Sequence, residues 1–129
     1  MMINVLIVGS GGREHAFTWK ASQSDHVEKI FIAPGNAGTT LEPKAKNIDI
    51  SATDIDALIS FSKKESIDLV IVGPEDPLVN GITNAFEKVG INCFGPSSAG
   101  AELEGSKDFA KSFMKKHSIP TASYESFTD

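Results

Sequence analysis

The sequence has little of several features that would mark a specialised class of protein. Its single cysteine, Cys93, cannot form a disulfide within the chain. Basic residues are not in surplus, because 12 Lys and Arg stand against 17 Asp and Glu, and the formal net charge is -5. Apolar runs such as residues 3–8 are too short to cross a membrane, and no basic segment of an export signal precedes them. These absences exclude an intrachain disulfide scaffold, argue against nucleic-acid and membrane partners, and predict a cytoplasmic location.

The features that are present indicate an α/β domain with a parallel sheet. The chain has 129 residues, of which 40% are hydrophobic and 22% charged, which suits one soluble domain with its own core. Apolar runs without alternation are typical of strands covered on both faces, and turns leading to helical patterns follow most of them. The predicted strands are residues 3–8, 29–33, 47–50, 68–72 and 91–94. This order predicts a Rossmann-like, doubly wound, five-stranded parallel sheet with right-handed crossovers.

The helical patterns divide the chain near residue 105. The predicted helices are residues 13–22, 53–62, 79–89 and 106–117, and Gly90 is a suitable cap for the third of them. Residues 121–129 look like the opening of a strand that has no later partner. We therefore expect a substrate domain at 1–105, and a linker helix with the beginning of a truncated second domain at 106–129.

A glycine-rich loop, Gly9-Ser10-Gly11-Gly12, joins the first strand to the first helix. Glycines permit a tight turn and close approach of a ligand, and a helix start presents unpaired amides to an anion. The dinucleotide pattern G-x-G-x-x-G is incomplete, because Glu14 stands at the third glycine position, where a carboxylate would crowd the helix–strand contact and repel a pyrophosphate. The second strand also ends in Ala33-Pro34 rather than in an acidic residue that would bind ribose. The loop predicts an anion site, with a merely tight turn as the structural alternative.

Three loops follow predicted strands, at residues 9–15, 34–38 and 73–78. The carboxyl ends of parallel strands meet at one edge of a sheet, so these loops are expected to converge on one ligand. They offer backbone amides, a guanidinium, an imidazole, carboxylates and an amide side chain, a set that suits a small polar molecule with an anionic end and a cationic or hydroxylated end. The candidate substrate-binding residues are Gly11, Gly12, Arg13, Glu14, His15, Gly35, Asn36, Gly73, Pro74 and Glu75.

In order and spacing, the motifs resemble the phosphoribosylamine–glycine ligase family of the ATP-grasp superfamily. They are GGREHA at residues 11–16, PGNAG at 34–38, GPEDPL at 73–78, FGP at 94–96 and GSKDF at 105–109. The resemblance runs over essentially the whole chain, and it implies the amino-terminal, pre-ATP-grasp domain that holds the phosphosugar. Members of the family continue well beyond this length through an ATP-grasp unit, which is the one large departure.

The resemblance implies an ADP-forming ligase of purine biosynthesis. Such an enzyme joins glycine to 5-phosphoribosylamine: ATP phosphorylates the glycine carboxylate, and the amine attacks the resulting glycyl phosphate. ATP and Mg2+ or Mn2+ would serve the full-length enzyme, with Lys107 contacting ATP phosphates, and neither is expected to bind stably to this piece alone. The partners implied are phosphoribosylamine and the rest of the ATP-grasp chain. We expect no catalytic residue within these 129 residues and no activity from them alone.

Several roles stay open at this point. Gly11 and Gly12 are assigned to the sugar phosphate, and Asn36 to ribose hydroxyls unless it only stabilises its own loop. Glu75 is assigned to the substrate amine, because prolines on both sides would hold it on a stiff loop; its alternative is to cap the helix that follows.

For the charged residues of the first helical turn the alternatives are structural. Arg13 would be solvated, Glu14 would favour the positive helix end, and His15 would pack against its surroundings. No His, Cys, Asp and Glu cluster has the spacing of metal ligands. Two other classes of function also remain: a free-standing Rossmann-like binding module for a phosphorylated metabolite or dinucleotide, and a purely structural or interaction role.

Overall fold

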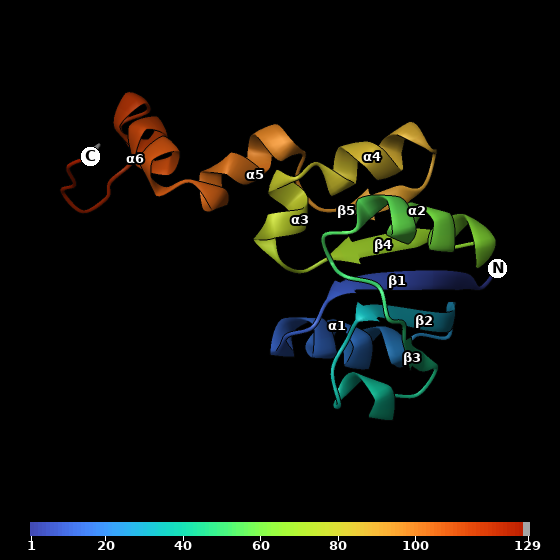
Figure 1. Ribbon diagram of the computed structural model, residues 1–129. Helices are drawn as coiled ribbons and strands as arrows, with labels where there is room; N and C mark the ends of the chain where they lie inside the picture. Colours follow the sequence, from blue (N-terminus) through green and yellow to red (C-terminus); the bar gives the residue numbers. More distant parts are fainter. Residues whose placement is uncertain (128–129) are drawn as a thin grey trace.

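The computed structural model describes residues 1–127, and within them five parallel strands form one sheet in the order β3-β2-β1-β4-β5 (Figure 1). The central strand, β1 (Ile3–Gly9), pairs with β2 (Val27–Pro34) on one side and with β4 (Leu69–Val72) on the other. The edges are β3 (Ala45–Asn47) and β5 (Asn92–Phe94). The predicted doubly wound parallel sheet is confirmed.

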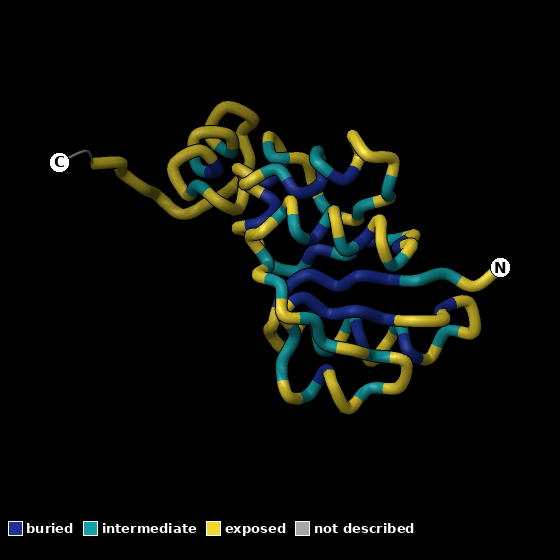
Figure 2. Tube along the Cα trace, turned by 45° about the vertical axis from the view of Figure 1, so that its right-hand side comes forward, coloured by how far each residue is buried: buried dark blue, intermediate teal, exposed yellow. Residues whose placement is uncertain are grey.

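The two faces of the sheet are buried by different helices, which explains why β1 reads as an unbroken apolar run. Val5 and Ile7 belong to a cluster that includes Phe17 of α1 (Gly12–Ser22). Leu6 and Val8 belong to a second, larger cluster on the opposite face. Figure 2 shows β1 buried along most of its length.

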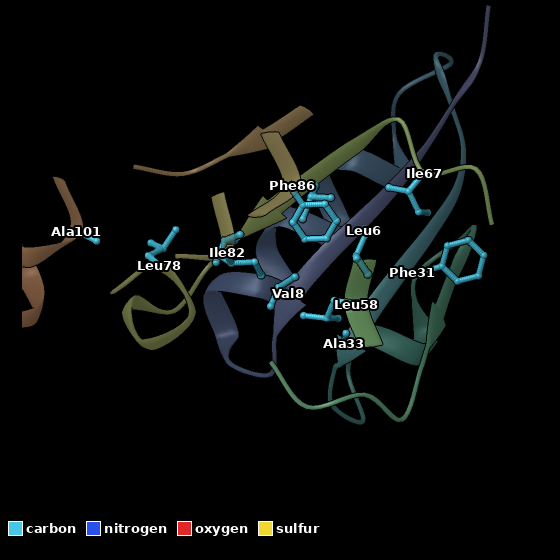
Figure 3. Close-up of a cluster of buried hydrophobic side chains, with 12 residues drawn as sticks. Leu6, Val8, Phe31, Ala33, Leu58, Ile67, Leu78, Ile82, Phe86 and Ala101 are labelled. Carbon is cyan, nitrogen blue, oxygen red and sulfur yellow. The ribbon is translucent and has the colours of Figure 1, made fainter. Parts of the chain in front are cut away.

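The larger cluster packs the sheet against α2 (Ile55–Lys64) and α4 (Ile82–Lys88), through Leu58 and Phe86 (Figure 3). Both side chains are fully buried. Two further helices, α3 (Glu75–Val79) and α5 (Ser98–Gly105), pack against each other beyond the carboxyl end of β4.

Residues 75–88 differ from the sequence expectation. The loop predicted at 73–78 contains most of a short helix, α3, and the helix predicted at 79–89 begins only at Ile82, as α4, after Asn80 and Gly81. Gly81 has φ of 86°, a left-handed conformation that keeps the two helices apart, so the predicted helix start at residue 79 was wrong. Gly90, with φ of 76°, follows α4 closely, as expected.

Three smaller differences concern the remaining elements. The third strand lies at Ala45–Asn47 rather than 47–50, because its pairing with Ile30–Ile32 sets the register. Helix α5 was not predicted; the Ser97 side chain accepts a hydrogen bond from the Gly100 N–H at 3.4 Å and caps it. No strand is present in residues 121–127, and the last two residues of the predicted 121–129 segment lie outside the described residues.

Helix α6 (Lys107–Lys116) follows the prediction for residues 106–117 closely. The Ser106 side chain caps it by accepting a hydrogen bond from the Phe109 N–H at 3.2 Å. It packs against α5 and lies apart from the sheet, with most of its surface exposed (Figures 1 and 2). None of the helices in residues 1–127 combines the length and the apolar character needed to cross a lipid bilayer.

Candidate functional site

The loops after β1, β2 and β4 meet at one edge of the sheet. The Gly35 N–H donates to the Gly9 carbonyl at 3.1 Å, which joins the second loop to the first. The Gly73 N–H donates to the Val8 carbonyl, also at 3.1 Å, which joins the third loop to the end of β1. Because the chain leaves β1 toward β2 on one side and later returns to β4 on the other, this edge is the topological switch point of the sheet. Ligands of open α/β sheets bind at such points.

Glu14 lies at the centre of this edge and is almost fully buried, with 3% of the residue exposed. Its Oε2 accepts a hydrogen bond of 2.6 Å from the N–H of Gly11, the residue that precedes α1. Its Oε1 accepts one of 3.0 Å from Arg13 Nε. This arrangement uses both carboxylate oxygens inside the protein, and the Gly11 contact satisfies an amide at the helix start.

Glycines surround the Glu14 side chain and make room for it. A Cβ added to Gly9 would lie 2.7 Å from Glu14 Cδ, and one added to Gly73 would lie 1.7 Å from Glu14 Oε1. The carboxylate therefore fills the crevice between the ends of β1 and β4. The crowding expected from a glutamate in place of the third glycine is accommodated by glycines of two different loops.

Arg13 lies in the first turn of α1 with 51% of its side chain exposed. Its Nε is held by Glu14, and its two terminal Nη groups form no hydrogen bond with any residue in the described part of the chain. The amides of the first helical turn lie beside it. This end of α1 offers N–H donors and a positive charge to an anion.

His15 faces the loop after β2. Its Nε2 lies 2.7 Å from Glu42 Oε1, with the ring nitrogen's role depending on the tautomer. The imidazole also packs against Gly38, where an added Cβ would lie 2.6 Å from the ring carbon Cε1. These contacts agree with the structural alternative for His15, in which its side chain packs against its surroundings.

Asn36 ties the second loop to the glycine loop. Its Oδ1 accepts hydrogen bonds from the N–H groups of Gly38 and Thr39 at 2.8 and 3.1 Å. Its Nδ2 donates to the carbonyls of Ser10 and Gly11 at 2.9 and 3.3 Å. Two acceptor sites and two N–H groups are all that an amide side chain has. These contacts therefore agree with the alternative in which the Asn36 side chain stabilises its own loop.

A layer of side chains under this loop was not singled out from the sequence. Thr39 is fully buried, and its hydroxyl donates to Asn47 Oδ1 at 2.6 Å. Asn47 Nδ2 donates to the Asn36 carbonyl at 2.8 Å, and Asn47 also lies where a Cβ on Gly35 would be. The Asn and Thr content of residues 36–40 was the available signal, since these residues form local turns.

Glu75 is the first residue of α3, it is exposed, and its side chain makes no hydrogen bond within residues 1–127. Pro74 holds the position before the helix. Two residues earlier, Gly73 lies against Glu14, so the loop that carries Glu75 abuts the glycine loop. The carboxylate is available to a ligand, and its place in the first turn also suits the helix dipole.

Lys107, by contrast, lies outside this edge. It is the exposed first residue of α6, and it lines a surface depression with Lys111 and Tyr124 to which none of the three loops contributes. Among residues 1–127, no group of three or more His, Cys, Asp and Glu side chains is arranged to hold a metal ion.

Fold and site together define a Rossmann-like α/β domain in which three loops meet at the switch point and Glu14 fills the crevice between the ends of β1 and β4. Comparison with known proteins gives the family. Residues 3–104 match the family described as "Phosphoribosylglycinamide synthetase, N domain". The chain belongs to this family.

Curated relatives agree with this assignment. The chain is 58% identical over 127 residues to phosphoribosylamine–glycine ligase of Vibrio vulnificus (strain YJ016) and 55% identical to that of Escherichia coli (strain K12). Each match covers 98% of this chain and 30% of the relative, so the chain spans about three tenths of the length of these proteins.

Solved structures show the same fold. Phosphoribosylamine–glycine ligase from Thermotoga maritima matches with a TM-score of 0.63 and 31% identity, over 95% of this chain and 27% of that one. The biotin carboxylase domain of thermophilic 2-oxoglutarate carboxylase matches with a TM-score of 0.69 and 18% identity, over 94% of this chain and 29% of the other, and shares the fold alone. The expected fold, that of the amino-terminal domain of the ATP-grasp superfamily, is confirmed.

Proposed function

We propose that this chain is the phosphosugar-binding domain of a phosphoribosylamine–glycine ligase. The full-length enzyme would join glycine to 5-phosphoribosylamine in purine biosynthesis, with ATP converted to ADP and phosphate and glycyl phosphate as the intermediate. The names of the relatives and the family match support this reaction. The observation that carries the proposal is the convergence of three loops at one sheet edge, with a helix start and an unpaired carboxylate beside each other.

One part of the edge faces the anionic end of the ligand, and another part faces its cationic end. The N–H groups at the start of α1, from Gly12 on, and the free Nη groups of Arg13 receive the sugar phosphate. Glu75 accepts hydrogen bonds from the substrate amine and turns its lone pair toward the acyl phosphate. The chemistry required of this domain is orientation of a nucleophile, which lowers the barrier by holding the reacting atoms in place.

The remaining ligands belong to the rest of the enzyme. ATP supplies the phosphoryl group that activates the glycine carboxylate, and the ammonium of Lys107, exposed at the start of α6, would contact its phosphates. Mg2+ or Mn2+ would accompany the ATP in the full-length enzyme, held outside this domain. The proposed location is the cytoplasm.

Ligand binding by the isolated 129-residue chain tests the proposal. The 15N-labelled chain is titrated with ribose 5-phosphate, with and without ammonium, because ammonia and ribose 5-phosphate equilibrate with phosphoribosylamine. We expect amide shifts confined to the three loops, and an affinity that rises about fivefold to tenfold with ammonium, as one charge-assisted hydrogen bond would produce.

Glu75→Gln should abolish the ammonium-dependent gain and leave the binding of ribose 5-phosphate unchanged. Asp76→Asn, which removes the neighbouring exposed carboxylate, is the matched control and should keep the gain. Equal behaviour of the two variants would refute the role of Glu75. A titration with NAD tests the alternative function, a free-standing binding module for a dinucleotide. Tight binding of NAD would identify such a module in spite of the filled crevice.

A further inference from the structure

Glu14 is buried at the candidate site, and its carboxylate is turned toward protein donors. Both carboxylate oxygens lie within hydrogen-bond distance of protein donors, at 2.6 and 3.0 Å. Only 3% of the residue is exposed, whereas the Arg13 side chain that it holds is 51% exposed. Burial of a carboxylate is costly unless its charge is paired and hydrogen-bonded, and these two contacts meet that condition.

The carboxylate connects the start of α1, which carries Arg13, with the loop after β4, which leads to Glu75. It fixes the Gly11 N–H at the start of α1, and it fixes the Nε of Arg13. It also lies in contact with Gly73, which leads to Glu75 on the neighbouring loop. The same side chain therefore contacts both the guanidinium of Arg13 and the loop that leads to Glu75.

We propose that Glu14 is a positioning residue that binds no substrate and acts through Arg13. By holding Nε, it presents the two Nη groups of Arg13 to the phosphate of the ligand. The inference deepens the proposed function and rests on it for the identity of the ligand. It replaces the sequence-based expectation of a direct contact between Glu14 and the substrate with an indirect one.

The chemistry of the Glu14→Gln substitution isolates this role. Glutamine has the same shape, and its Oε1 can still accept from the Gly11 N–H, but its Nε2 is a donor and cannot accept from Arg13 Nε. The substitution removes the guanidinium contact and keeps the volume that fills the crevice. Without this contact the guanidinium is no longer oriented, so we expect the dissociation constant for ribose 5-phosphate to rise by up to about tenfold, the value of one charge-assisted hydrogen bond from Arg13 to the phosphate.

A double-mutant cycle with Arg13→Ala tests whether Glu14 acts through Arg13. If it does, Glu14→Gln weakens binding in the native background and has no further effect in the Arg13→Ala background. Two outcomes would overturn the proposal. Fold-changes that multiply in the double variant would show that Glu14 acts independently of Arg13, and an unchanged dissociation constant with a lowered melting temperature would indicate a merely structural role.

A ligand-free measurement keeps this test separate from the proposed function. In the 15N spectrum of the native chain, the Nε–H of Arg13 should exchange slowly with water, and this protection should be lost in Glu14→Gln and kept in Glu75→Gln. Fast exchange in the native chain would refute the positioning role. If the native chain shows this protection and yet does not bind ribose 5-phosphate, the phosphosugar assignment fails, but the contact by which Glu14 holds Arg13 is confirmed.

Discussion

At the scale of single residues, the glycines of the candidate site differ in whether they lie next to Glu14. Gly73 has no positive φ, so its identity is explained by space alone, because an added Cβ would lie 1.7 Å from Glu14 Oε1. Gly12, only two residues before Glu14, has open space around it. Two glycines of the same candidate site are therefore present for different reasons, and substitution separates them.

We predict that Gly73→Ala lowers the free energy of unfolding by about 1–3 kcal/mol, the usual cost of overpacking. Gly12→Ala is the matched control, and since it adds a methyl group to a helical position without a clash, it should leave stability unchanged or raise it slightly. Urea denaturation followed by circular dichroism measures both. Equal effects of the two substitutions would show that Glu14 moves away from Gly73 without cost.

Cys93 lies in a setting that disfavours the reactive thiolate. Its thiol is half-buried beside the Thr83 hydroxyl, at a sulfur–oxygen distance of 3.7 Å. Burial raises the pKa of the Cys93 thiol above its ordinary value, and the nearby Glu87 carboxylate adds to this while the Thr83 contact opposes it. The neutral thiol is favoured, which is the opposite of what a nucleophile needs.

At the scale of elements, α5 and α6 differ in how they pack against the rest of the chain. Ala101 of α5 is buried in the main core, whereas α6 contacts α5 and has Phe109 and Phe113 exposed at 40% and 37%. A helix that covers no sheet face contributes little to the folding of the sheet. The boundary near residue 105 therefore stays a prediction, which shortening the chain can test.

We predict that a chain ending at Ser106 unfolds with a free energy within about 1 kcal/mol of the full 129 residues, since few buried side chains are lost. Ser106 is kept because its N–H donates to the Glu102 carbonyl at 2.9 Å and completes α5. A chain ending at Gly95 is the control, and it should be markedly less stable because it loses Ala101 from the core. If both shortened chains are equally destabilised, α6 belongs to the same cooperative unit as the sheet.

At the scale of the whole molecule, one edge of one sheet holds the three loops, and Lys107 lies in a separate depression. The chain also spans about 30% of the curated ligases that it matches. Under the proposed function, this edge would orient one substrate, and the residues that activate the other would lie in the rest of the full-length enzyme.

We therefore predict that the 129-residue chain forms no ADP when it is given ATP, Mg2+, glycine and phosphoribosylamine. A coupled assay for ADP measures this, with a full-length relative as the positive control. Robust turnover by the chain alone would refute the assignment of this part to substrate binding.

The amino-acid sequence by itself determined the class of fold and the convergence of the loops. Unbroken apolar runs such as residues 3–8 specify strands covered on both faces, and parallel strands place the loops that follow them at one edge. Glu14 at the third glycine position also argued, by sequence alone, against a dinucleotide site. These inferences depend on local pattern and on rules that hold for any parallel sheet.

Only the tertiary structure decided what the polar side chains of the edge contact. The neighbours of Glu14 include Gly73, those of His15 include Glu42, and those of Asn36 include Ser10, all far apart along the chain. Local sequence patterns carry no record of such contacts, because they arise when strands from distant segments pair and bring their loops together. For the same reason the sequence left Glu14 as a candidate ligand, whereas burial and two hydrogen bonds make it part of the frame that holds Arg13.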